Sequence, residues 1–196
     1  PKRPFADDLT RQFAWGQAVR TLRGPQRARL MRRLPDASLL GRLDFAAMLS
    51  NLHAELVANN LDFAHVAEQI AGLGEAREIA RWELLKQVEA AYLNTLDELG
   101  LWDRQTARLV AINQRELTTN RDVLLVGTVD LNVSQRLMLE QIADRVTALV
   151  FTDPSRADGF DEFGGLRPER WQSARIDNVF ERTVVSGTGA FDPWIG

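Results

Sequence analysis

Hydrophobic residues recur at three- and four-residue intervals through most of the first 120 positions, which is the spacing of one face of an α-helix. The pattern predicts helices over residues 7 or 8 to 22, 26–33, 36–58, 62–71, 75–98 and 103–113. In the first helix the residues expected to face inward are Phe5, Leu9, Phe13, Val19 and Leu22. Residues 1–120 are therefore predicted to form an all-helical subdomain.

Two short runs of apolar, β-prone residues follow, Val123 to Val126 and Thr147 to Phe151. Between them an amphipathic helix is expected to begin at Asn132 and to extend to about Val146, with Gln135 completing a capping box. A strand, a helix and a strand within about thirty residues form a βαβ unit, and strands without polar alternation are typical of a parallel sheet covered on both faces.

The βαβ unit is expected to occupy residues 121–186. Residues 176–185 are the one further candidate strand, and residues 187–196 are expected to form a tail with poor order.

Composition places the chain among ordinary packed proteins. It has 196 residues, 45% of them hydrophobic, and no cysteine, which excludes disulfides and thiolate metal sites. Because no apolar run approaches the roughly 18 residues of a membrane span and no signal peptide opens the chain, we expect a cytoplasmic protein without a membrane partner. The chain begins at Pro1, so we expect it to be a fragment of a longer protein.

The net charge of -3 conceals an uneven distribution. Residues 1–42 carry ten Lys or Arg and three Asp or Glu, and the basic residues of the second predicted helix are Arg27, Arg29, Arg32 and Arg33. A cluster of arginines is typical of a phosphate-binding face, so these four are the candidate DNA-binding residues. An arginine-rich surface helix without a ligand is the alternative interpretation.

Motifs for phosphate and metal chemistry are missing from the chain. No G-x-x-x-x-G-K-[ST] loop occurs, and neither Lys2 nor Lys86 completes the acid-x-lysine pair of a PD-(D/E)xK nuclease. His53 and His65 lack neighbours at metal-ligand spacing. We therefore expect no catalytic residue and no metal site within this fragment.

The stretch from Val126 to Pro154 resembles superfamily 1 DNA helicases of the UvrD/Rep kind. In that family a strand ends in an Asp-Glu pair that binds magnesium, a Gln-Asp-x-Asn-x-x-Gln turn opens a helix, and the next strand ends in Gly-Asp-Pro. This chain matches with D-L-N-V-S-Q from Asp130 to Gln135 and with Thr152-Asp153-Pro154. Gly127 and Thr128 stand where the two carboxylates belong, so the resemblance implies a degenerate Walker B position. Magnesium or nucleotide contacts would then fall to Asp130, Gln135 and Asp153.

Residues 61–120 are similar to the helical insertion of AddB-like proteins, which belong with RecC to a class of helicase-nuclease subunits. The resemblance implies an α/β fold: a partial RecA-like (P-loop NTPase-like) parallel sheet with a large all-helical insertion subdomain. It implies a non-catalytic, helicase-like part of a DNA double-strand-break repair enzyme, which binds single-stranded DNA or a duplex end and docks to an AddA-like helicase subunit. The fragment itself would hold no cofactor, and ATP and magnesium would belong to the parent protein.

Two alternatives remain open. The first is an active ATP-hydrolysing helicase domain whose phosphate loop lies upstream of Pro1, with Asp130 or Asp153 as the magnesium ligand. The second is a helical protein-interaction domain with an incidental βαβ unit.

Overall fold

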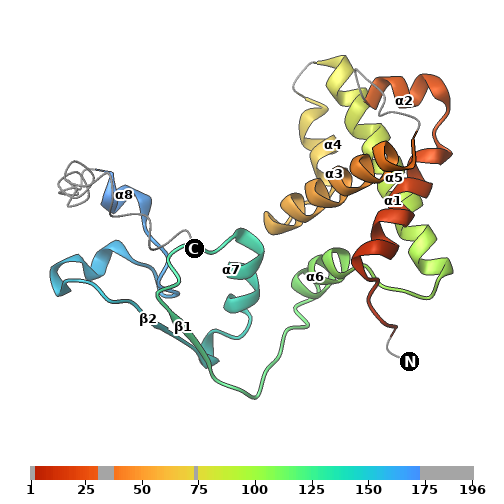
Figure 1. Ribbon diagram of the computed structural model, residues 1–196. Helices are drawn as coiled ribbons and strands as arrows, with labels where there is room; N and C mark the ends of the chain where they lie inside the picture. Colours follow the sequence, from red (N-terminus) through yellow and green to blue (C-terminus); the bar gives the residue numbers. More distant parts are fainter. Residues whose placement is uncertain (1–2, 31–37, 73–74, 173–196) are drawn as a thin grey trace, which may run out of the picture. The chain divides into compact units, whose positions relative to one another are not determined.

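The structure is a computed structural model that describes residues 3–30, 38–72 and 75–172 (Figure 1). The fold is mostly helical, with one small two-stranded parallel sheet. The helices are α1 (Asp8–Thr21), α2 (Gly24–Leu30), α3 (Leu39–Ala58), α4 (Phe63–Ile70), α5 (Ala76–Glu98), α6 (Arg104–Asn113), α7 (Val133–Glu140) and α8 (Pro168–Trp171). The strands are β1 (Val123–Val126) and β2 (Val146–Leu149), and the 3-10 turns are η1 (Ala143–Arg145) and η2 (Pro154–Gly159).

The chain divides into two compact units. The first, which we call the helical unit, comprises Pro1–Leu124 and Leu131–Thr147. The second unit comprises Leu125–Asp130 and Ala148–Gly196. The division falls within both strands, so each strand begins in the helical unit and ends in the second unit. The predicted strand at 176–185 and the predicted tail at 187–196 lie outside the described residues.

Side-chain caps explain where α1, α3, α4, α6 and α7 begin. The N-cap residues Asp7, Ser38, Asp62, Asp103 and Asn132 each accept a hydrogen bond from the backbone N–H three residues later. Such a cap satisfies one of the four N–H groups that a helix start leaves unpaired. The helices expected from the sequence are therefore confirmed, with ends that differ by a few residues.

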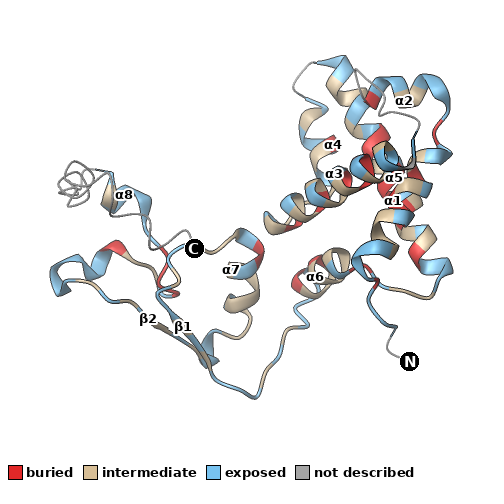
Figure 2. Cartoon of the chain, viewed as in Figure 1, coloured by how far each residue is buried: buried red, intermediate tan, exposed pale blue. Residues whose placement is uncertain are grey.

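The core of the helical unit lies where α1 packs against α3 and α5, and where α4 packs against α5 (Figure 2). Its largest fully buried side chains include Trp15, Phe63 and Tyr92. On α1 the buried face consists of Ala14, Trp15 and Ala18.

The predicted inward face of the first helix is therefore wrong in part. Phe5, Leu9 and Phe13 are exposed by 52%, 59% and 50%. The packing of α1 on α3 and α5 instead buries Trp15, a large side chain whose burial removes much apolar surface from water, and leaves Phe13 exposed. On α3, Phe45, Ala46 and Leu49 are buried, and Leu40 and Met48 are exposed.

The parallel pairing of the two apolar strands is confirmed. The N–H of Gly127 donates to the carbonyl of Leu149 at 2.9 Å, which places Val126 beside Leu149 on one face of the sheet. The expectation of strands covered on both faces is wrong, because Leu124, Val126 and Leu149 are all more than half exposed. Within the described residues the sheet has two strands, and alternate side chains along each strand are exposed.

The helix between the strands is shorter than predicted, and it packs against α3 and α6. The Ser134 hydroxyl donates to the Val57 carbonyl at the end of α3, and the Gln141 amide donates to the Ile112 carbonyl at 2.8 Å. The chain then turns through η1 into β2. No helix in the described part of the chain is long and apolar enough to cross a membrane.

Candidate functional site

The turn after β1 holds Gly127 and Thr128, the two residues predicted to form a degenerate Walker B position. Gly127 has φ +61°, in the left-handed region that glycine adopts without steric cost, and it continues the hydrogen bonding of the strand to Leu149. Thr128 is half-buried, and Asp130 is exposed. Neither Gly127 nor Thr128 carries a carboxylate, so this turn supplies no charged ligand and no proton acceptor at the position where the helicase motif has both.

Asp153 follows β2 and serves as the N-cap of η2. Its Oδ1 accepts hydrogen bonds from the Ser155 backbone N–H at 2.8 Å and from the Ser155 hydroxyl at 2.7 Å. These bonds from Ser155 lower the pKa of Asp153 below its ordinary value. The hydrogen-bonding capacity of one carboxylate oxygen is thus used locally, within the turn.

Gln135 belongs to the helical unit, where it completes the predicted capping box at the start of α7. Its Oε1 accepts from the Asn132 N–H at 3.0 Å, and the Asn132 Oδ1 accepts from the Gln135 N–H at 2.9 Å. The same two side chains that match the helicase motif therefore act as a helix cap.

A loop from Asp161 to Leu166 packs against the turn after β1 in the second unit. The Leu166 N–H donates to the Val129 carbonyl at 3.2 Å, and Gly164, with φ +79°, approaches so closely that a Cβ would lie 2.9 Å from Cγ2 of Val150. The Asp161 carboxylate stabilises the loop by accepting from the N–H groups of Phe163 and Gly165, both at 2.9 Å.

The residues after the two strands do not fit the magnesium site that the helicase resemblance implies. Asp130 is the one exposed carboxylate in the turn after β1, and Asp153 already caps η2. In the described ranges no group of three or more His, Asp or Glu side chains is placed to hold a metal ion. We therefore derive no metal-dependent step from this region.

The structure describes two of the four candidate DNA-binding arginines. Arg27 and Arg29 lie on α2, Arg27 half-buried and Arg29 exposed. Arg32 and Arg33 lie outside the described residues. Arg29 is thus the member of the set whose guanidinium is available on the surface of this helix.

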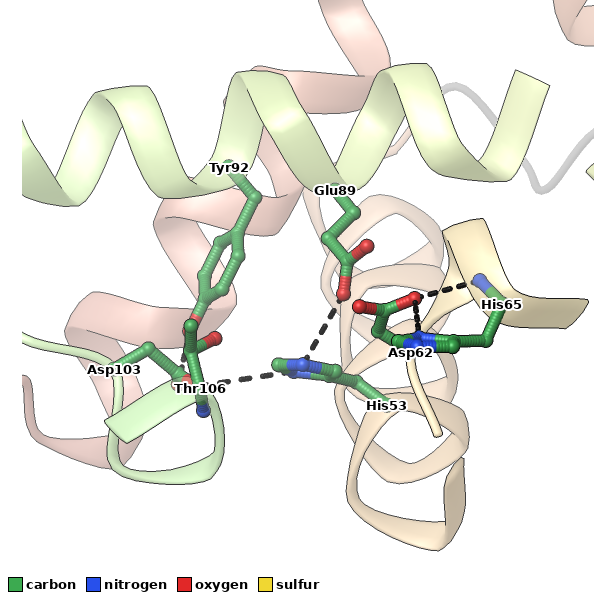
Figure 3. Close-up of polar contacts among 7 residues, drawn as sticks. All are labelled: His53, Asp62, His65, Glu89, Tyr92, Asp103 and Thr106. Atoms are coloured by element: carbon green, nitrogen blue, oxygen red, sulfur yellow. Dashed lines mark hydrogen bonds and ion pairs between the residues drawn. The ribbon is translucent and has the colours of Figure 1, made fainter. Parts of the chain in front are cut away.

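A buried group of polar side chains lies in the core of the helical unit (Figure 3). We call it the polar core cluster, and it consists of His53 from α3, Glu89 and Tyr92 from α5, and Asp103 at the start of α6. The Tyr92 hydroxyl donates to Asp103 Oδ1 at 2.7 Å, and the Thr106 N–H donates to Oδ2 at 2.7 Å. One carboxylate therefore caps α6 and joins it to α5.

His53 lies close to two carboxyl groups and to an aromatic ring. Its Nε2 lies 3.3 Å from Glu89 Oε1, and its Nδ1 lies 3.9 Å from Asp103 Oδ2. The Nε2 atom is buried without a hydrogen-bond partner, because the contact with Glu89 lacks the geometry of a hydrogen bond. The Trp15 ring stacks on Tyr92 with centroids 4.0 Å apart and meets His53 edge-on at 5.7 Å.

Burial dominates the ionisation of the polar core cluster. It lowers the pKa of His53, against the opposing charge of Asp103, and it raises the pKa of Glu89 to about 8, helped by the charge of Asp62. Burial and the neighbouring Asp103 also raise the pKa of Tyr92. His53 and Glu89 are therefore both mainly neutral at pH 7, which is how a buried pair avoids the cost of burying a charge.

The sequence shows only that His53 lacks neighbours at metal-ligand spacing, and the polar core cluster was not predicted. His53 is four residues from both Leu49 and Val57, which are fully buried, and Glu89 stands beside the buried Val88. The sequence could have indicated each residue as a polar side chain within a buried helical stripe. It could not have indicated which residues His53 and Glu89 contact.

Comparisons of this chain with known protein families, curated proteins and solved structures find no match.

Proposed function

We propose that this chain is a non-catalytic, helicase-like part of a DNA double-strand-break repair helicase-nuclease, with a partial RecA-like sheet, and that it serves DNA binding and subunit docking. The observation that carries the proposal is the parallel pair β1 and β2, joined through α7, with Gly127 and Thr128 directly after β1. The order of strand, capped helix and strand is that of the helicase motif pair, and the two carboxylates that catalysis needs are replaced.

Loss of catalysis follows from the residues themselves. Phosphoryl transfer depends on magnesium and on an oriented water, both held by carboxylates in this position. Glycine and threonine provide neither. The capping roles of Gln135 and Asp153 give the rest of the motif a structural use that needs no nucleotide.

The role in DNA binding is supported by the charge of the first part of the chain. Residues 1–42 hold ten Lys or Arg and three Asp or Glu, although the whole chain is slightly acidic. Neutralisation of phosphates by such a segment gives affinity that falls with salt.

The test is a fluorescence anisotropy titration of the chain with labelled single-stranded and forked DNA at roughly 50 and 200 mM salt. We expect micromolar or tighter binding at the lower salt concentration and clear weakening at the higher one. No binding in the micromolar range at low salt would contradict the role in DNA binding. The variant Arg27→Ala/Arg29→Ala tests the α2 arginines, with Arg167→Ala/Arg170→Ala in the second unit as a control of equal charge change.

The alternative with an active ATPase has a separate test. If Asp130 held magnesium in the parent protein, Asp130→Ala would abolish ATP hydrolysis by the full-length protein. We expect equal rates for both forms, because Asp130 is exposed and stands outside the strand.

A second candidate function, a helical protein-interaction domain, is favoured by one observation: the buried core cluster is made up of residues from helices α1 to α5 and their flanking segments. Size-exclusion chromatography with an AddA-like helicase subunit would test docking. Binding to that subunit without any binding to DNA would favour this second function.

A further inference from the structure

A groove of about 320 Å³ lies between α1 and α3 of the helical unit. Its lining includes Gln12, Phe13, Gly16, Gln17 and Arg20 from α1 and Arg42 from α3. We call it the α1–α3 groove. Its volume is at the lower end of the roughly 300–1,000 Å³ of small-molecule pockets, which is room for a group of about the size of one base.

The α1 side of the groove is a regular stripe. Phe13, Gly16, Gln17 and Arg20 are spaced at three- and four-residue intervals, so they share one face of α1. This face is distinct from the buried face that contains Trp15. The groove is therefore an outer surface of the helix pair, which α1 and α3 form by packing together.

Gly16 is the one glycine among the described residues that line the groove. It lies in the middle of α1, where glycine is less favourable than alanine, and a Cβ placed on it would meet no heavy atom within 4 Å. Neither close packing nor a positive φ requires glycine here. Its effect on the structure is to leave open space beside Phe13.

The side chains of Arg20 and Arg42 are exposed and could bind a ligand. Among the described residues, no ion pair or side-chain hydrogen bond engages the guanidinium of Arg20 or of Arg42, whereas Arg11 pairs with Asp8 and Arg3 with Asp97. A guanidinium binds phosphate through two parallel hydrogen bonds, which makes such a pair of free arginines well suited to a nucleic-acid backbone. The Phe13 ring, 50% exposed, adds an aromatic face in the same groove.

We propose that the α1–α3 groove binds single-stranded nucleic acid, with one base stacked on Phe13 above Gly16 and the adjoining phosphates held by Arg20 and Arg42. This inference rests on the proposed DNA-binding function and locates it. Arg20 is seven residues from Phe13, about 10 Å along the helix, and helical side chains lean towards the N-terminus, so a long Arg20 side chain can reach back along the groove towards the ring.

An acidic peptide would also satisfy two arginines, but it would not use the rest of the groove. An exposed aromatic ring next to a glycine with open space around it accepts the flat face of a base, and stacking of this kind tolerates any sequence. The observations thus favour a single-stranded nucleic acid over an acidic peptide.

The experiment is an anisotropy titration of the whole chain with fluorescein-labelled oligo(dT). We expect Arg20→Ala/Arg42→Ala to raise Kd at least tenfold and to reduce the salt slope by about 1.4, the value for two single-strand phosphates. Phe13→Leu should raise Kd about fivefold or more through lost stacking. Gly16→Leu should block the groove and weaken binding, whereas Gly16→Ala, which adds one methyl group, should bind like the wild type.

The control Arg167→Ala/Arg170→Ala removes the same charge from the second unit and should change Kd less than twofold. Circular dichroism melts would verify that each variant folds, as expected for exposed positions. If the wild type fails to bind oligo(dT), the proposed DNA-binding function fails. If it binds and the groove variants match the control, only the groove assignment is overturned. Loss of oligoglutamate binding in Arg20→Ala/Arg42→Ala, with oligo(dT) binding unchanged, would overturn it in favour of an acidic peptide.

Discussion

Oε1 of Glu89 lies 3.3 Å from Nε2 of His53 inside the helical unit, and burial holds the pKa of Glu89 at about 8. In the unfolded chain this carboxyl group ionises near its ordinary pKa of 4.5. Between these two pKa values the folded state binds more protons than the unfolded state. The stabilisation that protonated Glu89 gives the folded state is therefore complete below pH 4.5 and is lost as the pH rises through 8. The lowered pKa of His53 acts in the opposite sense and only below 6.5, its ordinary pKa.

The interval from pH 6.5 to 8 therefore isolates Glu89. Over this interval we expect its ionisation to reduce the free energy of unfolding by about 2 kcal/mol. Glu89→Gln keeps the shape and removes the charge, so its unfolding free energy should vary correspondingly less with pH. Urea titrations at several pH values would measure both. An identical pH dependence in the wild type and the variant would contradict the assignment of a raised pKa to Glu89.

Tyr92→Phe should destabilise the helical unit by about 1–3 kcal/mol, because it leaves the buried Asp103 Oδ1 without the donor now at 2.7 Å. The ring and its stacking on Trp15 are retained, so the loss reports the hydroxyl alone. The measurement is the midpoint of urea unfolding. Thr95→Ala, which removes a half-buried hydroxyl bonded within the same helix, is the control and should cost less. An unchanged midpoint for Tyr92→Phe would show that the hydroxyl adds nothing to stability.

Arg115→Gly should stabilise the helical unit by about 1 kcal/mol. Arg115 ends α6 with φ +54°, in the left-handed region, and the Glu116 N–H donates to the Ala111 carbonyl at 3.0 Å, as in a Schellman motif. Any side chain other than glycine or asparagine is disfavoured there. Thermal melts would measure the gain.

The matched control for this substitution is Asn60→Gly. Asn60 ends α3 with φ +57° in the same motif, and asparagine tolerates that conformation. The Asn60→Gly variant should therefore gain much less stability than Arg115→Gly. Equal stabilisation by the two substitutions would refute the explanation from backbone strain.

Gly164→Ala should loosen the loop that packs on the turn after β1. The added Cβ would lie 2.9 Å from Cγ2 of Val150, and alanine would have to adopt the left-handed φ of +79° that glycine has here. We expect a loss of about 1–3 kcal/mol of local stability. Hydrogen exchange of residues 148–166 would detect it. Val150→Ala in the same chain should relieve the contact but not the backbone strain, so partial recovery is expected, and full recovery would exclude the contribution of φ.

The helix starts could be predicted because each cap is local. Asp62, Asp103 and Asn132 hydrogen-bond to N–H groups three residues away, so the sequence alone contains both partners. The parallel order of β1 and β2 was predictable for a similar reason, since a helix of intermediate length joins two apolar runs.

The rotation of the helices was not predictable to the same extent. Phe13 and Trp15 are both large and apolar, and only the packing of α1 on α3 and α5 decides that Trp15 is buried and that Phe13 is exposed. For the same reason the candidate site near Arg20 and Arg42 is invisible in the sequence, because 22 positions separate residues that line one groove.

The chain passes between the two units three times, after Leu124, after Asp130 and after Thr147. A single proteolytic cut at any of these points would still leave the two units connected through the other two crossings. Neither unit corresponds to one continuous stretch of the gene, so truncation cannot yield both intact. Separating the helical unit would require circular permutation, or a short linker that joins Leu124 to Leu131 in place of residues 125–130 of the second unit.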